Sequence, residues 1–286
     1  NDDGIDWPSE AQLKAGQENL QAEETTQAVL AVLQEALKMA PQTQAESASV
    51  SKVRHAVKLA GELKIAAAYD ALIQLLDTGP AYRNEAVEAL GRLGKAEAAT
   101  ALVKLAGQCV KMEARTGLPL SPQPIQEKDA RAAETYWHIL QALGNIPTTE
   151  ALNLLLEAAS DSAPDKRQAA LDSAIKLFRK TNGQLARSNE VKTAVIKSLN
   201  DPSTAMRTMA AQACAPMNLS DAIPPLSKLA LAGEISLARA ALDSLTELAA
   251  AGEKEKVVAA LTEAARAERN GAKSKRILDF VESKLK

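Results

Sequence analysis

The sequence repeats itself between SKVRHAVKLAGEL, at residues 51–63, and AYRNEAVEALGRLG, at residues 81–94. Within these stretches, AVKLAGEL and AVEALGRL align at a shift of 30 residues. In each copy the apolar residues recur at the three- and four-residue spacing of one helical face, and a second apolar run follows a short turn. Two amphipathic helices cannot bury their apolar faces alone, so the repeat predicts helical pairs that stack on one another.

A marker arginine near the start of the first helix lets the repeat be followed along the chain. The marker arginines are Arg54, Arg83, Arg131, Arg167, Arg207 and Arg239, with a weaker copy at Arg276. Their separations are 29, 48, 36, 40, 32 and 37 residues, and all but one suit a helix–turn–helix unit. The sequence therefore predicts an all-α fold, an α-solenoid of helical hairpins.

The 48-residue interval contains a proline-rich insertion at about residues 117–128. The preceding helix is expected to continue through CVKMEAR at residues 109–115 before the prolines end it. Long connections in repeat arrays often bind partners, but they also occur as tolerated insertions packed over a helix edge. Both interpretations of the insertion stay open at this point.

The two ends of the chain differ from the repeats between them. Residues 1–44 are predicted to form an N-terminal segment with atypical capping helices, one ending near Leu20 and one from Glu24 to Ala40. Residues 45–271 form the repeat array, and residues 272–286 a C-terminal capping helix. Residues 1–50 carry nine acidic and two basic side chains, whereas residues 254–286 carry five acidic and nine basic ones.

Composition limits the function classes. The 286 residues are 46% hydrophobic, 24% charged and only 2% aromatic, with a formal net charge of -2. This charge gives no global attraction to nucleic acid or anionic lipid. No apolar run reaches the roughly 18 residues of a membrane span. Because the first residue is Asn rather than Met, a removed signal peptide and a trimmed chain are both consistent with it, and we favour a periplasmic or secreted location over a cytoplasmic one.

Two stretches resemble HEAT repeats of the short type also found in phycobilin-lyase proteins: VRHAVKLAGELKIAAAYDALIQLL from Val53 and YRNEAVEALGRLGKAEAATALVKLA from Tyr82. The resemblance is clear over residues 51–106 and extends over residues 129–268. It implies a right-handed superhelix of HEAT-like hairpins. It also implies that the marker arginines, from Arg54 to Arg239, form a structural ladder with acidic or carbonyl groups of neighbouring repeats.

Residues able to perform chemistry are scarce. The chain has two histidines, His55 and His138, and two cysteines, Cys109 and Cys214. None of them has a second ligand or a base at the spacing that metal binding or nucleophilic catalysis requires. We therefore expect no catalytic residue, no metal site and no cofactor.

The second helices of HEAT-like hairpins line the concave surface, so their outward residues are candidate contacts for a partner. These candidates are Tyr69, Asp70, Gln74, Lys104, Glu150, Asn153, Lys192, Lys197, Lys228 and Lys256. Tyr136 and Trp137, which follow the insertion, are a further candidate, because paired aromatic residues often form interface hot spots. They could equally fill the gap that the insertion creates.

These observations favour a non-catalytic scaffold or adaptor that binds another protein through the concave face. The resemblance supplies an alternative, a bilin lyase or isomerase that handles a tetrapyrrole. A nucleic-acid-binding helical repeat is the least favoured, since the lysines lack interleaved aromatic residues that would stack on bases. The identity of the partner and the oligomeric state stay open.

Overall fold

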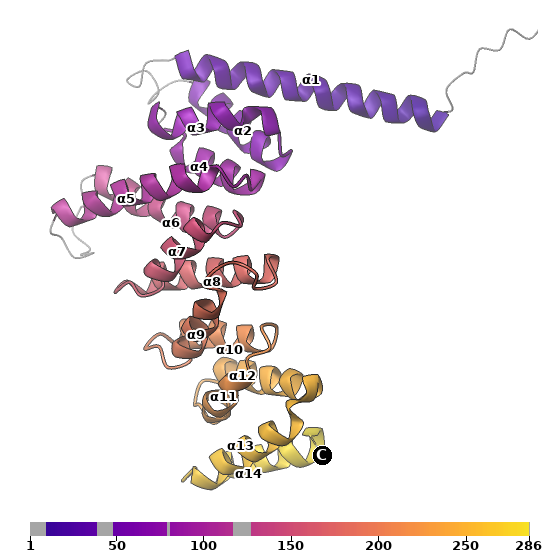
Figure 1. Cartoon of the computed structure of the whole chain (residues 1–286), viewed down its shortest axis with the longest axis vertical. Coiled ribbons are helices and arrows are strands. Elements are labelled where there is room, and N and C mark those ends of the chain that lie inside the picture. Colours follow the sequence, from indigo (N-terminus) through magenta and orange to yellow (C-terminus); the bar gives the residue numbers. More distant parts are fainter. Residues whose placement is uncertain (1–9, 39–47, 79–80, 117–126, 286) are drawn as a thin grey trace, which may run out of the picture. The chain divides into compact units, whose positions relative to one another are not determined.

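The computed structural model describes residues 10–38, 48–78, 81–116 and 127–285. These residues form helices joined by turns, with no strand among them, as the all-α prediction requires (Figure 1). The chain divides into two compact units, residues 1–142 and residues 143–286. The division into caps and array expected from the sequence stays a prediction, and the proline-rich insertion at 117–126 lies outside the described residues.

The first unit contains two hairpins of the predicted kind. The helices of this unit are α1 (Glu10–Lys38), α2 (Ala48–Glu62), α3 (Tyr69–Thr78), α4 (Arg83–Leu93), α5 (Ala98–Thr116) and α6 (Glu127–Leu143). Helix α2 packs against α4, and α3 contacts both α4 and α5. A 3-10 turn, Ala66–Ala68, leads into α3. Helix α5 continues to Thr116, as expected from the sequence.

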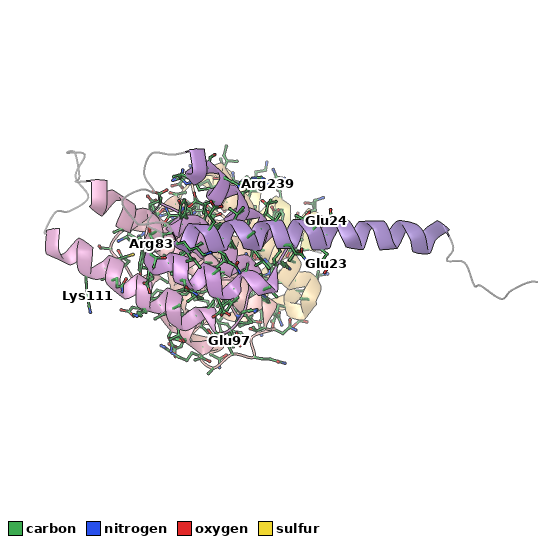
Figure 2. The ribbon with its side chains drawn as sticks, turned by 90° about the horizontal axis from the view of Figure 1, so that it is seen from above. Glu23, Glu24, Arg83, Glu97, Lys111 and Arg239 are labelled. Carbon is green, nitrogen blue, oxygen red and sulfur yellow. The ribbon has the colours of Figure 1, made fainter. Side chains whose placement is uncertain are left out.

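The N-terminal segment differs from the prediction of two helices. Residues 10–38 form the single helix α1, which contacts α2 and α3. Its C-terminal half buries Val29, Leu33 and Ala36, which share one helical face. Glu23 and Glu24 project from α1 into solvent (Figure 2). No proline or turn-forming residue interrupts the segment between Leu20 and Glu24, so one helix satisfies the backbone without a break.

The second unit stacks the remaining hairpins. Its helices are α7 (Thr149–Ala158), α8 (Pro164–Lys180), α9 (Ser188–Ser198), α10 (Thr204–Cys214), α11 (Ile223–Leu229), α12 (Ile235–Leu248), α13 (Lys254–Ala267) and α14 (Gly271–Phe280). Short helical segments at Ser220–Ala222, Ala249–Glu253 and Val281–Leu285 complete it. The first helices α8, α10 and α12 contact one another in order, and α9 and α11 pack against them. The α-solenoid arrangement of hairpins is therefore present in the structure.

Glycines of the repeat allow close contact between neighbouring first helices. A methyl group added at Gly61 would lie 2.7 Å from the Ala89 Cα, and one added at Gly91 would lie 2.7 Å from the Ala142 Cα. The backbone of one helix thus reaches the backbone of the next. This close contact explains why glycine recurs in AVKLAGEL and AVEALGRL.

Candidate functional site

In the first unit, the predicted surface residues lie on α3 and α5, two helices that contact each other. Asp70, Gln74 and Lys104 are exposed, whereas Tyr69 is half-buried. The Lys95 ammonium lies 4.7 Å from the centre of the Tyr69 ring. Burial raises the pKa of Tyr69, and the carboxylates of Glu97 and Asp70 raise it further.

In the second unit, the predicted residues lie on the second helices of successive hairpins. Glu150 and Asn153 are exposed on α7, Lys197 is exposed on α9, and Lys228 is exposed on α11. Helix α7 contacts α9, and α11 contacts α13. Within this unit, the predicted contact residues therefore all lie on the second helices of the hairpins.

The four lysines of this series differ in their surroundings. The Lys192 ammonium lies 5.7 Å from the centre of the Phe178 ring, and the Lys256 ammonium lies 2.8 Å from the Glu253 carboxylate. The hydrogen bond with Glu253 raises the pKa of Lys256. Neither Lys197 nor Lys228 has an ion pair within the part of the chain that the structure describes.

Sequence reasoning missed Arg187, which links two of the second helices. Its guanidinium donates a hydrogen bond of 2.7 Å to the Asn153 side chain on α7 and also pairs with Glu190 on α9. Arg187 has a positive φ of 69° and precedes α9 as its N-cap. No motif marks Arg187, since residues 181–189 (TNGQLARSN) do not belong to the repeated pattern.

The structure separates the two aromatic residues expected to act together. Tyr136 is only 5% exposed, so its ring is not at the surface, whereas Trp137 is 40% exposed. Tyr136 shares the buried face of α6 with Ile139, Leu140 and Leu143. The neighbouring Thr135 donates a hydrogen bond of 2.7 Å to the Asn84 side chain on α4. This arrangement matches the packing interpretation for Tyr136 and leaves Trp137 as the surface residue.

The marker arginines of α8 and α10 contact the loops around them. Arg167 forms a bidentate pair with Asp201, at 3.0 and 3.1 Å, and also donates to the carbonyls of Asp161 and Ser162. Arg207 donates to the carbonyls of Asp201 and Pro202 and pairs with Glu234 at 3.4 Å. The Asp201 carboxylate therefore accepts hydrogen bonds from Arg167, and the Asp201 backbone carbonyl accepts one from Arg207.

The electrostatics of Asp201 follow from these contacts. Burial pushes the pKa of its carboxyl upward, but hydrogen bonds from Arg167 and the Ser203 backbone, with the charges of Arg167 and Arg207, outweigh it. The net effect lowers the pKa of Asp201. Asp201 remains ionised at neutral pH and joins two repeats.

The remaining marker arginines differ from one another in their contacts. Arg54 donates to the Ala81 carbonyl and pairs with Glu85 at 3.2 Å, and Arg83 donates to the Leu76 carbonyl at 2.6 Å. The Arg131 side chain lies outside the described residues. Arg239 is 81% exposed at its side chain and pairs only with Asp243, on its own helix, at 3.7 Å among the described residues.

The two cysteines are packing residues. Both side chains are buried, and burial raises the pKa of the Cys214 thiol to about 12. Such a thiol is protonated at neutral pH and is a poor nucleophile. The described residues contain no group of three side chains arranged to hold a metal ion. Among these same residues, no helix is long and apolar enough to cross a lipid bilayer.

Comparison with known families agrees with the repeat pattern. Residues 42–118 match the family model of HEAT repeats, and residues 136–161 match that of the PBS lyase HEAT-like repeat. These two stretches match HEAT-repeat patterns, in agreement with the resemblance noted in the sequence. No curated protein matches the chain in sequence.

Several solved structures are similar to this chain at low identity. The complex of CpcE and CpcF of phycocyanin lyase from Nostoc sp. PCC7120 has 18% identity and a TM-score of 0.41, covering 87% of this chain and 96% of that one. An engineered protein has 16% identity and a TM-score of 0.45, covering 84% and 62%. Human deoxyhypusine hydroxylase in complex with glycerol has 18% identity and a TM-score of 0.33, covering 92% and 99%. With TM-scores below 0.5, these similarities carry no argument about function.

Proposed function

We propose that this protein is a non-catalytic scaffold or adaptor that binds another protein through the second helices of its hairpins. The observation that carries the proposal is the exposure of Lys197 and Lys228 on α9 and α11, without an ion pair among the described residues. Fixed helices present these charges, so binding costs little ordering on this side of the interface.

The proposed partner surface carries an acidic segment. Lys192, Lys197 and Lys228 bring three positive charges to one unit, and Arg187 holds α9 against Asn153 of α7. Charges of this kind accelerate association and select against like-charged partners. We expect the affinity to fall as the salt concentration rises, because exposed charges are screened.

Charge reversal tests the proposal. The triple variant Lys192→Glu, Lys197→Glu, Lys228→Glu should capture at least tenfold less of the main partner from native extracts than the parent protein does. The matched control reverses Lys176, Lys275 and Lys284, which are exposed elsewhere in the same unit. The control should retain the partner, and both variants should keep the helical circular dichroism of the parent. Equal capture by the two variants would exclude the second-helix lysines from binding.

A second candidate function rests on the match of residues 136–161 to the PBS lyase HEAT-like repeat. In that case the protein would hold a tetrapyrrole during its attachment to, or removal from, a carrier protein. The partly exposed Trp137 lies in the matched segment and offers an apolar contact for such a ring system. Titration of the protein with bilin should then shift the bilin absorbance, and Trp137→Ala should reduce the shift. An unchanged spectrum would exclude this candidate.

A further inference from the structure

A surface groove lies between the first helices α10 and α12 of the second unit. Its volume is about 750 Å³, and its lining includes Thr208 and Gln212 from α10 and Ser236 and Ala240 from α12. Helices α9 and α11 pack against α10 and α12, so the groove is formed by different helices from those that carry the lysines. The groove therefore belongs to a surface distinct from the one proposed above.

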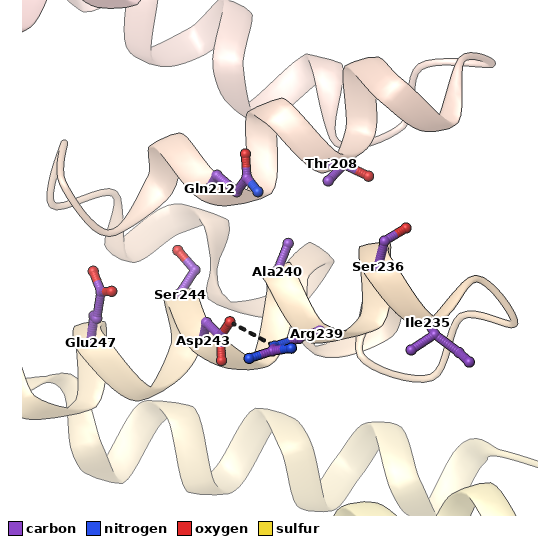
Figure 3. A pocket seen from close by; sticks show the side chains of 9 residues that line it. All are labelled: Thr208, Gln212, Ile235, Ser236, Arg239, Ala240, Asp243, Ser244 and Glu247. Atoms are coloured by element: carbon purple, nitrogen blue, oxygen red, sulfur yellow. Dashed lines mark ion pairs between the residues drawn. The ribbon is translucent and has the colours of Figure 1, made fainter.

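Short side chains create the groove. Ser236, Ala240 and Ser244 on α12 face Thr208 and Gln212 on α10 (Figure 3). At the C-terminal end of α10, the Ala215 backbone N–H donates a hydrogen bond of 3.0 Å to the Ser244 hydroxyl on α12. Because the facing side chains are small or polar, the space above the contact is not filled.

Arg239 on α12 does not make the contacts between repeats that the marker arginines of α8 and α10 make. Between α8 and α10, the bidentate pair of Arg167 and Asp201 spans the two repeats. Arg167 and Arg207 are the fourth residues of their helices, but Arg239 is the fifth residue of α12. One residue turns a side chain by about 100° around a helix. Arg239 is thereby directed to the groove opening, where Asp243 is its partner.

The two ends of the groove differ in chemistry. Ile235, at the start of α12, is 82% exposed, the highest value among the exposed large apolar side chains that the structure describes. Toward the other end, Asp243 and Glu247 are exposed carboxylates. From Ile235 to Glu247 the helix rises about 18 Å, at about 1.5 Å per residue. An apolar contact and an acidic contact are thus held about three helical turns apart.

We propose that this groove binds a helical segment of another protein, one that carries an apolar anchor for Ile235 and a lysine or arginine for Asp243 and Glu247. Ala240 and Ser244 are buried and form the floor of the groove, so a bound helix would contact the exposed side chains of Gln212 on α10 and Ser236 on α12, as in other helix-in-groove complexes. The high exposure of Ile235 and Arg239 leaves the groove open, whereas small-molecule sites enclose most of the ligand. The lining carries one arginine and two carboxylates, and because Arg239 pairs with Asp243, the carboxylate of Glu247 is the unpaired charge among the described lining residues; it selects a basic segment over an acidic one.

A displayed library of random 16-residue peptides, selected against the full chain, tests this proposal. We expect the enriched peptides to place Leu, Ile, Met or Phe two to three helical turns from Lys or Arg. The variants Ile235→Ser and Asp243→Lys, Glu247→Lys should each weaken binding of a synthetic copy at least tenfold. Replacing the basic residue of that peptide with Glu should restore binding to the second variant. The lysine variant of α9 and α11 should bind like the parent.

Matched controls address general effects of polarity and charge. Leu278→Ser changes another exposed apolar residue of this unit, and Glu255→Lys, Glu263→Lys reverses two exposed carboxylates of α13. Both controls should bind the peptide unchanged. Failure to enrich any peptide, or enriched peptides insensitive to the groove variants, would overturn the proposal. A dimer in sedimentation that Ile235→Ser abolishes would also overturn it, since the groove would then hold a second copy of this chain.

Discussion

Asp201 is the residue through which two repeats of the second unit are joined. It accepts two hydrogen bonds from Arg167, and both side chains are largely buried, at 14% and 12% exposure. Removing one partner of a buried pair leaves the other charge without compensation. We therefore expect the marker arginines to differ in how much each one contributes to stability.

Arg167→Ala should lower the free energy of unfolding by about 3 kcal/mol, because Asp201 and two loop carbonyls lose their donor. Arg239→Ala is the matched control, since its exposed pair with Asp243 should contribute about 0.5 kcal/mol or less. Urea unfolding followed by circular dichroism measures both. Equal losses for the two variants would contradict a structural role for Arg167.

The lowered pKa of Asp201 predicts a pH dependence of stability. A carboxyl whose pKa is lower in the folded state stabilises the protein above its unfolded pKa of about 3.9. That stabilisation disappears as the pH falls through the lower folded value. Between about pH 5 and pH 2, the parent should therefore lose stability more steeply than Asp201→Asn. Parallel curves of unfolding free energy against pH would show that Asp201 is not stabilised by its pairs.

At the scale of elements, glycine has opposite effects in two kinds of helical position. Gly91 faces the Ala142 backbone, which cannot move aside as a flexible side chain can. Gly107, inside α5, has no heavy atom within 4 Å of an added methyl group. The first position requires glycine for helix contact, and the second has only its conformational cost.

Gly91→Ala should destabilise the protein by about 1–3 kcal/mol through overpacking. Gly107→Ala should stabilise it by up to about 1 kcal/mol, because alanine favours the helix. Thermal unfolding of the two variants beside the parent gives both signs in one experiment. A stabilising effect of Gly91→Ala would mean that α4 and α6 are further apart than the structure has them.

Element predictions from the sequence succeeded where the periodicity was local. The spacing of Val53, Ala56, Val57 and Ala60 predicted α2, and all four side chains are buried. The prediction failed at α1, because a possible break near Leu20 had no proline or turn motif to enforce it. The direction in which Arg239 points from its helix could not be predicted either, because the one-residue shift that exposes it depends on where α12 begins.

At the scale of the whole molecule, sequence predicted the fold class better than the candidate site. Repetition multiplies a weak local signal, so the α-solenoid could be recognised from several copies of one pattern. A binding surface is not repeated. The bond between Arg187 and Asn153 joins residues 34 positions apart through a link with no motif. The burial of Tyr136 likewise depends on α6 packing, which an isolated aromatic pair does not reveal.

The most direct test of the scaffold proposal is site-specific photo-crosslinking from the second helices. A photoreactive amino acid at position 197 should form a covalent adduct with the partner in native extracts, because Lys197 is exposed and has no ion pair among the described residues. The same amino acid at position 176, exposed on α8, should form much less of that adduct. Crosslinking at position 176 but not at position 197 would contradict binding through the second helices.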